Sequence, residues 1–114
     1  MLQELFLGFA RVHILYHASR EPVYGLGLQA ELGRHGYRLS PGTLYPILNS
    51  LEKSGYLLKS ERVVEGKVRK YYVITDAGLR ILHEAQAKIQ ELASEVLGNQ
   101  EPHMRRDELQ GLVH

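Results

Sequence analysis

The stretch Ser40-Pro41-Gly42-Thr43-Leu44-Tyr45-Pro46-Ile47-Leu48-Asn49-Ser50-Leu51-Glu52-Lys53-Ser54 decides the fold, because it joins the chemistry of a helix start to an apolar stripe. Ser40 can cap the helix with Pro41 as its first residue, or Thr43 can cap it with Pro46 in the first turn. The second start is favoured, because a proline deeper in a helix loses a hydrogen bond and clashes with the preceding turn. Apolar residues then recur at i, i+3, i+4 and i+7, which predicts an amphipathic helix: Leu44, Ile47, Leu48 and Leu51.

Two helices are expected before this one. The first runs from about Leu2 to Ser19 and ends before Glu21-Pro22, since the residue preceding a proline disfavours helix. The second runs from about Tyr24 to His35, and Gly36 follows it where a helix end favours a left-handed residue. In the first helix, steps of three and four produce one apolar seam: Leu2, Leu5, Phe9, Val12 and Tyr16.

Two strands and a long helix are expected after Gly55. Tyr56–Val64 and Lys67–Ile74 have strand character, and Glu65-Gly66 between them fits a tight hairpin tip. Thr75-Asp76 then caps a helix that extends to about Leu97. The predicted fold class is mainly α with a small β-hairpin, a winged helix-turn-helix with an additional helix at each end.

The predicted domain organisation has three parts. Residues 1–74 form a winged helix-turn-helix domain, residues 75–98 a dimerisation helix, and residues 99–114 a flexible tail. The length of 114 residues suits one such domain, with 44% hydrophobic and 24% charged residues. No apolar run is long enough for a membrane span, and no secretory signal is evident. The absence of cysteine fits a reducing cytoplasm and removes thiolate chemistry.

Catalytic motifs are missing from the sequence. It has no phosphate-binding Gly-Lys-Ser/Thr loop, and Gly25-Leu26-Gly27 lacks the third glycine and preceding strand of a dinucleotide site. No nucleophile with a base or catalytic carboxylate pair can be assigned. The protein is therefore expected not to be an enzyme and to require no cofactor.

Charge is unevenly distributed, although the formal net charge is only +1. Between Lys59 and Lys70 five basic residues face two acidic ones, a local balance of +3, whereas residues 75–100 are mildly acidic. A basic hairpin beside a helix-turn-helix is suited to hold a DNA backbone. The expected phosphate-binding residues of the hairpin are Arg62, Lys67, Arg69 and Lys70.

The outward face of the third helix is short and polar. Asn49 has the hydrogen-bonding groups to contact adenine and Ser50 those for either base type, within a DNA major groove. Phosphates would be held by Thr43, the Tyr45 hydroxyl and Lys53, with backbone N–H groups at the helix start. The expected DNA-facing residues outside the hairpin are Tyr24, Ser40, Thr43, Tyr45, Pro46, Asn49, Ser50 and Lys53.

Several of these residues together resemble the PadR family of transcriptional regulators. The resemblance rests on Tyr24-Gly25, on Ser40-Pro41-Gly42-Thr43-Leu44-Tyr45-Pro46 with Leu48 and Leu51-Glu52, on Gly55-Tyr56-Leu57 and on Tyr71-Tyr72-Val73-Ile74-Thr75-Asp76-Ala77-Gly78. It extends from about Leu5 to Leu97 and matches the smaller branch of the family.

The resemblance implies a homodimer that binds palindromic promoter DNA, usually as a repressor released by a small effector. It also implies that Thr43, Tyr45, Asn49 and the wing residues face DNA. Members that sense flat aromatic drugs use a tryptophan in the final helix, and this chain has no tryptophan. The effector is therefore expected to be a metal ion or a hydrophobic small molecule of another class.

A second apolar seam on the last helix also predicts a homodimer, because one small domain cannot easily bury both seams. Packing of the first helix on the last within one chain is the competing interpretation. The residues expected at the dimer interface are Leu5, Phe9, Val12, Tyr16, Leu82, Ala85, Ile89, Leu92 and Val96.

His13 and His17 stand one helical turn apart beside the first seam. Two imidazoles at this spacing can bind Zn²⁺ or another divalent ion if a further residue completes the site, with Glu84, His83 or Glu4 of a second copy as candidates. The other interpretation is two partly buried interface histidines. His35 has no ligand spacing in the sequence. A winged-helix protein-interaction module without DNA binding remains the alternative to a regulator.

Overall fold

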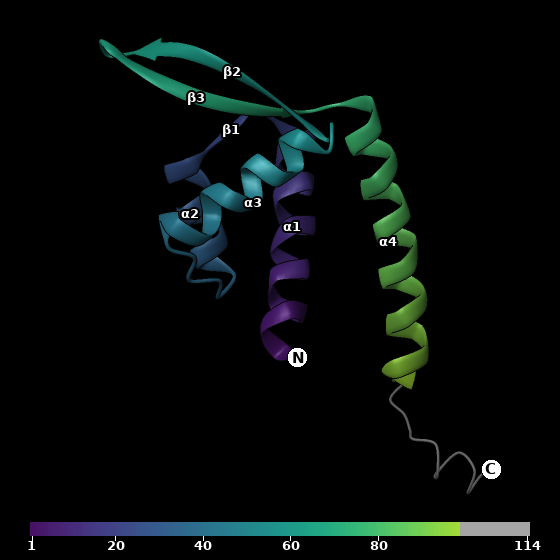
Figure 1. The fold of residues 1–114 in the computed structure, drawn as a ribbon. Helices are drawn as coiled ribbons and strands as arrows, with labels where there is room; N and C mark the ends of the chain where they lie inside the picture. Colours follow the sequence, from purple (N-terminus) through teal and green to yellow (C-terminus); the bar gives the residue numbers. More distant parts are fainter. Residues whose placement is uncertain (99–114) are drawn as a thin grey trace, which may run out of the picture. The chain divides into compact units, whose positions relative to one another are not determined.

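Four helices and three strands follow one another along residues 1–98, the part of the chain that the computed structural model describes. The predicted fold class is confirmed, and Figure 1 shows the hairpin lying across the helices α1 to α3. The predicted tail, residues 99–114, lies outside the described residues. The elements are α1 (Leu2–Arg20), β1 (Val23–Tyr24), α2 (Gly25–Arg34), α3 (Pro41–Lys53), β2 (Leu57–Val64), β3 (Lys67–Ile74) and α4 (Asp76–Val96).

The core of residues 1–82 is formed by the inner faces of α1, α2 and α3, by one face of the sheet and by the start of α4. The apolar stripe of α3 lies in the core, where Leu44 and Leu48 are completely buried. Burying such leucines stabilises a fold by roughly 1.5–3 kcal/mol each. The core residues of α1 are a different set from the predicted seam: Ala10, Ile14, Leu15 and Ala18.

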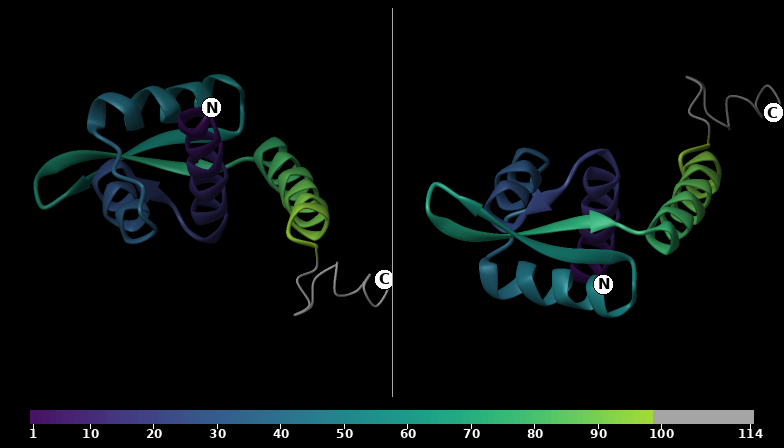
Figure 2. Two further views of the ribbon diagram at one scale, coloured as in Figure 1. Left: turned by 90° about the horizontal axis from the view of Figure 1, so that it is seen from below. Right: turned by 90° about the horizontal axis from the view of Figure 1, so that it is seen from above.

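The sheet has the strand order β1-β3-β2, and all its pairings are antiparallel. Figure 2 shows the β2–β3 hairpin extending beyond the helices. At its tip Glu65 and Gly66 have φ angles of 52° and 79°. Positive φ at both central residues is the requirement of the two-residue turn that best matches strand twist, so the predicted tight tip is confirmed.

The start of α3 corrects the favoured prediction. The helix begins at Pro41 with Ser40 as its N-cap residue, and the backbone amides of Thr43 and Leu44 donate to the Ser40 carbonyl. Pro41 suits the first helical position, because the amide it lacks would have no partner there. Pro46 is therefore inside the helix, where it removes one hydrogen bond near the exposed N-terminal end.

A two-residue strand stands where α2 was expected to begin. Val23 pairs with Tyr72 and Tyr24 with Tyr71, so α2 starts at Gly25. Two residues are too few for a sequence pattern, and the pairing partner is almost fifty positions away. This short strand fixes Tyr24 beside the hairpin, which matters for the site.

The chain divides into two compact units, and the boundary between them lies within α4, after Leu82. Thr75 caps the helix, because the amide of Gly78 donates to its Oγ1 atom at 3.0 Å, as the sequence predicts. The domain division at residues 74 and 75 stays a prediction. No helix within residues 1–98 is both long and apolar enough to cross a bilayer.

Candidate nucleic-acid interface

The outward face of α3 is open to solvent along its length. Pro46, Asn49, Ser50 and Lys53 are exposed and line a shallow hollow together with Glu52. Tyr45 is 41% exposed. Thr43 is half-buried, and its Oγ1 atom is 3.4 Å from Oγ of Ser40. The helix thus presents hydrogen-bonding side chains on the side opposite its buried leucines.

The tyrosine of this face is seated on α2. A Cβ atom at residue 25 would overlap the Tyr45 hydroxyl and approach its ring carbon Cζ to 2.6 Å. Only glycine leaves room for the Tyr45 ring at this place. Gly25 therefore sets the position of the Tyr45 ring beside the polar face of α3.

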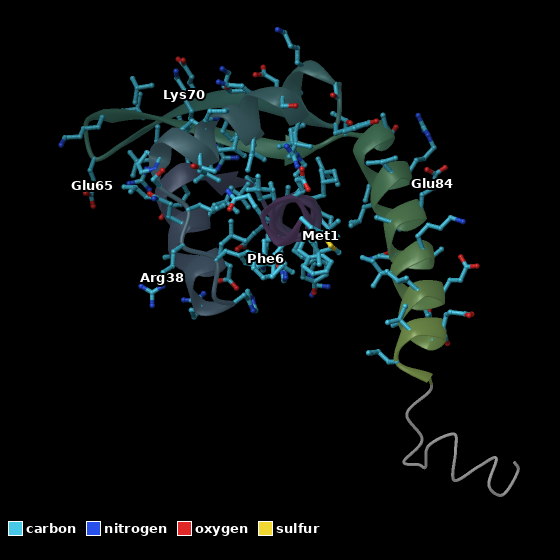
Figure 3. The ribbon with its side chains drawn as sticks, turned by 60° about the horizontal axis from the view of Figure 1, so that its bottom comes forward. Met1, Phe6, Arg38, Glu65, Lys70 and Glu84 are labelled. Atoms are coloured by element: carbon cyan, nitrogen blue, oxygen red, sulfur yellow. The ribbon has the colours of Figure 1, made fainter. Side chains whose placement is uncertain are left out.

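The wing, defined here as β2, β3 and their turn, divides its charges between two faces. Arg62 lies directly opposite Arg69 in the strand register, whereas Lys70 lies opposite Glu61. Because side chains alternate along a strand, Lys70 is on the other face from both arginines. Cross-strand pairing of opposite charges makes the Lys70 face less cationic than the arginine face. Figure 3 labels Lys70 on the hairpin and Glu65 at its tip.

Two tyrosine rings hold the arginines of the wing in place. The Arg69 guanidinium carbon lies 4.3 Å from the ring centre of Tyr24, and that of Arg62 lies 4.4 Å from the ring centre of Tyr71. The two rings are themselves 5.3 Å apart. Cation–π contacts at exposed sites contribute roughly 0.5–1 kcal/mol each. A hydrogen bond with Tyr71 also raises the pKa of Arg69, which stays charged at any physiological pH.

A concave surface joins the wing to the helices. It is lined by residues from the start of α2, by Tyr45 of α3 and by wing residues that include Lys67, Arg69 and Lys70. Tyr24 and Leu26 lie on its α2 side, and Leu26 is 67% exposed. Predicted DNA-facing residues thus line two hollows: Tyr24, Tyr45, Lys67, Arg69 and Lys70 line this surface, and Pro46, Asn49, Ser50 and Lys53 line the one on α3.

Both predicted interface seams carry exposed apolar side chains. On α1, Leu5, Phe9 and Tyr16 are each about two-fifths exposed, while Val12 packs partly against the core. On α4, Ala85 is half-buried, and exposure increases along the seam at Ile89, Leu92 and Val96. Leu82 differs, because it is buried in the core of residues 1–82 and needs no second copy to cover it.

The histidine pair of α1 has a third member. His13, His17 and His35 offer ring nitrogen atoms that all lie within 4.8 Å of one another. His35 ends α2 and stacks on His13, with ring centres 4.8 Å apart. His35 has no ligand spacing in the sequence, and the packing of α2 on α1 brings it next to His13 and His17, which lie 22 and 18 positions earlier in the chain. Glu4, one of the suggested completing residues, instead pairs with the amino terminus.

Residues 14–84 match the model of the transcriptional regulator PadR-like family. The chain belongs to this family. Its matched segment starts in α1 and ends in the first turns of α4, so it contains α3 and the wing. PadR-like proteins are transcriptional regulators that bind DNA, and not enzymes.

Relatives of known structure or known role agree with this PadR-like assignment. The transcriptional regulator Rv3488 of Mycobacterium tuberculosis is 48% identical over 99 residues, which are 87% of this chain and 92% of that protein. A PadR family regulator from Eggerthella lenta superimposes with a TM-score of 0.75 at 37% identity, covering 90% of this chain and 91% of that one. A PadR-like regulator from Bacillus cereus gives 0.78 at 32% identity, covering 86% and 97%.

Sequence reasoning missed three features of this PadR-like site. The contact of the Tyr24 ring with Tyr71 and Arg69 depends on the strand β1. The separation of Lys70 from the arginines follows from strand alternation, which was available in the sequence once the hairpin was assigned. The role of His35 depends on tertiary packing, for which the sequence gives no local signal.

Proposed function

We propose that this regulator binds a two-fold symmetric promoter sequence as a homodimer and represses transcription until a small effector releases it. The observation that carries the proposal is the exposed polar face of α3 next to a concave surface with cationic wing residues. A helix can read bases in a major groove only if its polar face is free and its position is held by neighbours.

Base reading is assigned to the middle of α3. Asn49 is exposed there, and an asparagine side chain can pair with both the acceptor and the donor of adenine. Ser50 contacts either base type. Thr43, Tyr45 and Lys53 lie toward the two ends of the helix and contact phosphates, which fix the register of the helix on the duplex.

Phosphate binding by the wing is assigned to Arg62, Lys67 and Arg69. The two arginines are held on tyrosine rings, so they lose little side-chain freedom when a guanidinium forms its paired hydrogen bonds to a phosphate. Lys70, opposite Glu61, contributes less to phosphate binding than the three residues of the other face. Contacts of this kind give affinity for any sequence and depend strongly on salt.

Dimerisation is assigned to the α1 and α4 seams. Isolated proteins rarely leave contiguous large apolar patches open, and such patches mark contact sites. Two copies related by a two-fold axis place two α3 helices about one turn of DNA apart, roughly 34 Å. The effector is a divalent metal ion or a hydrophobic small molecule.

The test begins with selection of bound duplexes from a random pool, followed by affinity measurements over a range of salt concentrations. We expect enrichment of a two-fold symmetric sequence. Removing two phosphate contacts in Lys67→Ala/Arg69→Ala should weaken binding to all duplexes and flatten the salt slope by about two. The control Arg20→Ala/Arg80→Ala removes the same charge outside α3 and the wing and should keep the slope.

Two results would contradict the proposal. An unchanged salt slope in the wing variant would exclude the assigned phosphate contacts. Failure of the wild-type protein to bind any duplex in dilute buffer would instead support the protein-interaction module. Repeating the selection with metal ions and with hydrophobic small molecules present tests release.

A further inference from the structure

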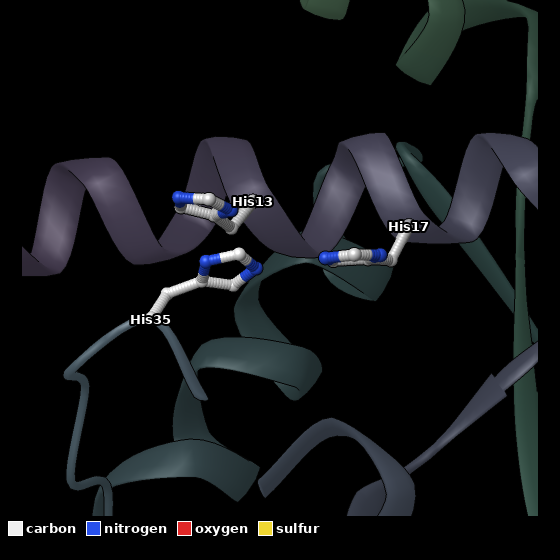
Figure 4. A group of neighbouring side chains, drawn as sticks. All are labelled: His13, His17 and His35. Carbon is white, nitrogen blue, oxygen red and sulfur yellow. The ribbon is translucent and has the colours of Figure 1, made fainter. Parts of the chain in front are cut away.

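Three imidazole rings meet where α1 passes the end of α2. We name His13, His17 and His35 the histidine cluster, and Figure 4 shows the ring of His35 beside the two rings that α1 presents. The ring centres of His13 and His17 are 6.1 Å apart, and those of His17 and His35 are 6.2 Å apart. The ring planes lie at small angles to one another, and one nitrogen of each ring lies within 4.8 Å of the other two.

The cluster contains a polar atom without a partner. Within the described part of the chain, Nε2 of His17 is shut off from solvent and makes no hydrogen bond. The nearest carboxylate oxygen, Oε2 of Glu31, is 3.7 Å away. Leaving a buried polar atom unpaired costs about 1–3 kcal/mol, a cost that folding would avoid unless the atom served another purpose.

Each ring of the cluster offers one nitrogen atom to a common point. A neutral imidazole has a free lone pair on one ring nitrogen, which is the form that binds metal ions.

We propose that the histidine cluster binds one divalent transition-metal ion per chain, with Zn²⁺ the best match. Nitrogen ligands at the usual zinc distance of about 2.0–2.1 Å are separated by about 3.3 Å in a tetrahedral site. The cluster nitrogens lie within 4.8 Å of one another, so they need to close by no more than about 1.5 Å. Rotation of surface-side imidazole rings provides such a change, and three protein ligands leave a fourth position open.

Glu31 supplies the negative charge that this site requires. Its Oε2 atom is 3.5 Å from Nε2 of His35 and 3.7 Å from Nε2 of His17, and Arg34 pairs with its other oxygen. A carboxylate next to ligating imidazoles orients the rings and increases their basicity. The carboxylate therefore strengthens the site, whereas the three histidines form it.

A bound ion would join α1 to the chain segment that leads into α3. Residues 36–40 connect His35 to α3. The Tyr37 ring in this connector contacts the His13 ring edge-on, with ring centres 5.2 Å apart. The carbonyl of Leu39, just before the reading helix, accepts a hydrogen bond from Gln29 of α2. Metal binding at the cluster would therefore affect the contacts by which α1 and α2 position the segment that leads into α3. Its consequence for release of DNA rests on the proposed function.

The first experiment titrates Zn²⁺ into the full chain without a tag, by calorimetry and by competition with a chromophoric chelator. We expect one ion per chain. Glu31→Gln should weaken binding by about 10–100-fold, and His35→Ala should weaken it more. The control Gln90→Ala shortens an exposed side chain of α4 and should bind like the wild type.

A spectroscopic readout separates ligation from a structural effect. Co²⁺ in a tetrahedral nitrogen site gives intense visible absorption, which is expected for the wild type and for Gln90→Ala, and absent in His35→Ala. His35 is the lead variant because its side chain is 44% exposed, so truncation leaves the core intact. The double variant His13→Ala/His17→Ala is the second arm, with circular dichroism to verify folding. Unchanged Zn²⁺ affinity in His35→Ala, or an equal loss in Gln90→Ala, would overturn the proposal.

The second experiment measures duplex binding with and without Zn²⁺. We expect Zn²⁺ to change the DNA affinity of the wild type and to leave that of His35→Ala unchanged. If Zn²⁺ binds at the cluster but leaves DNA affinity unchanged, the coupling to α3 is overturned and the metal site stands. If no duplex is bound under any condition, the proposed function fails, whereas the Zn²⁺ titration still decides the metal site.

Discussion

The helices α3 and α4 carry the same kind of apolar pattern, but the stripe of α3 is buried whereas most of the seam of α4 is exposed. In α3 the stripe Leu44, Ile47, Leu48 and Leu51 is at most 6% exposed. In α4 the seam is buried at Leu82 and then increasingly exposed, from 43% at Ile89 to 67% at Val96. The difference cannot come from the helical period, because both stripes follow steps of three and four.

The comparison teaches that an amphipathic pattern specifies that a face will be buried, and not which partner will bury it. The α3 stripe lies in the core cluster of the same chain, where α3 contacts α2 and β2, so the stripe stabilises the fold itself. The outer seam of α4 stabilises an assembly if a second copy covers it, as proposed above. Substitutions in the two stripes should therefore affect different measurements.

The largest effect on stability is expected for Leu48→Ala, which opens a cavity beneath α3. The free energy of unfolding should fall by about 2–5 kcal/mol, because Leu48 is completely buried. Chemical denaturation at low protein concentration measures this change. The matched control Leu92→Ala shortens a leucine that is 57% exposed and should cost less than about 0.5 kcal/mol under the same conditions. Equal losses in the two variants would contradict the contrast between the stripes.

A charge in the outer seam should break the assembly without unfolding the chain. For Ile89→Asp we expect the dissociation constant of the dimer to rise at least a hundredfold, or about 2.7 kcal/mol, because an unpaired carboxylate would be buried at the interface. Analytical ultracentrifugation measures this change. Ser94→Asp adds the same charge on the opposite side of α4 and should keep the dimer. A dimer that tolerates Ile89→Asp would place the interface elsewhere.

A substitution on the polar side of α3 should change DNA binding and not the free energy of unfolding. Asn49→Ala should reduce discrimination at one base position by about 1–3 kcal/mol, since it removes a paired contact with an adenine. Competition between the selected duplex and its single-base variants gives this value. The exposed position of Asn49 leaves the unfolding free energy nearly unchanged. Uniform weakening across all duplexes would instead make Asn49 a phosphate contact.

The smallest expected effect is the difference in stability between losing the N-terminal cap of α4 and losing that of α3. Thr75 receives the Gly78 amide and donates to the Gly55 carbonyl at 2.6 Å, so Thr75→Ala should lower the unfolding free energy by about 1 kcal/mol. The Ser40 side chain makes no capping hydrogen bond to the backbone, and Ser40→Ala should change stability by less than half as much. Thermal denaturation of both variants at one protein concentration checks the order.

Much of the fold was predictable from the sequence, because its elements have strong local signals. The Glu65-Gly66 turn, the Thr75 cap and the α3 stripe are decided by residues within a few positions of one another. The start of α3 was not predicted correctly, because the conflict between Pro41 and Pro46 depends on how much one lost hydrogen bond costs at an exposed helix end. Local rules do not give that balance.

The candidate site was predictable where it follows one element and not where it joins several. The outward residues of α3 follow from its own stripe, so Asn49 and Ser50 could be assigned from sequence. The contact of His35 with His13 and the stacking of Arg69 on Tyr24 arise from packing of separate elements. The α1 seam shows the same limit, since the face that fills the core is offset from the seam that the period suggested.

The contact between Gly25 and Tyr45 limits how this regulator can be retargeted to new operators. Residues such as Asn49 and Ser50 touch nothing in the core, so a library at these positions can explore other base preferences at little risk to the scaffold. Residue 25 has no such latitude, because any side chain there would displace the Tyr45 ring from its position against α2. A designer should therefore vary the outer face of α3 and leave the glycine beneath it untouched.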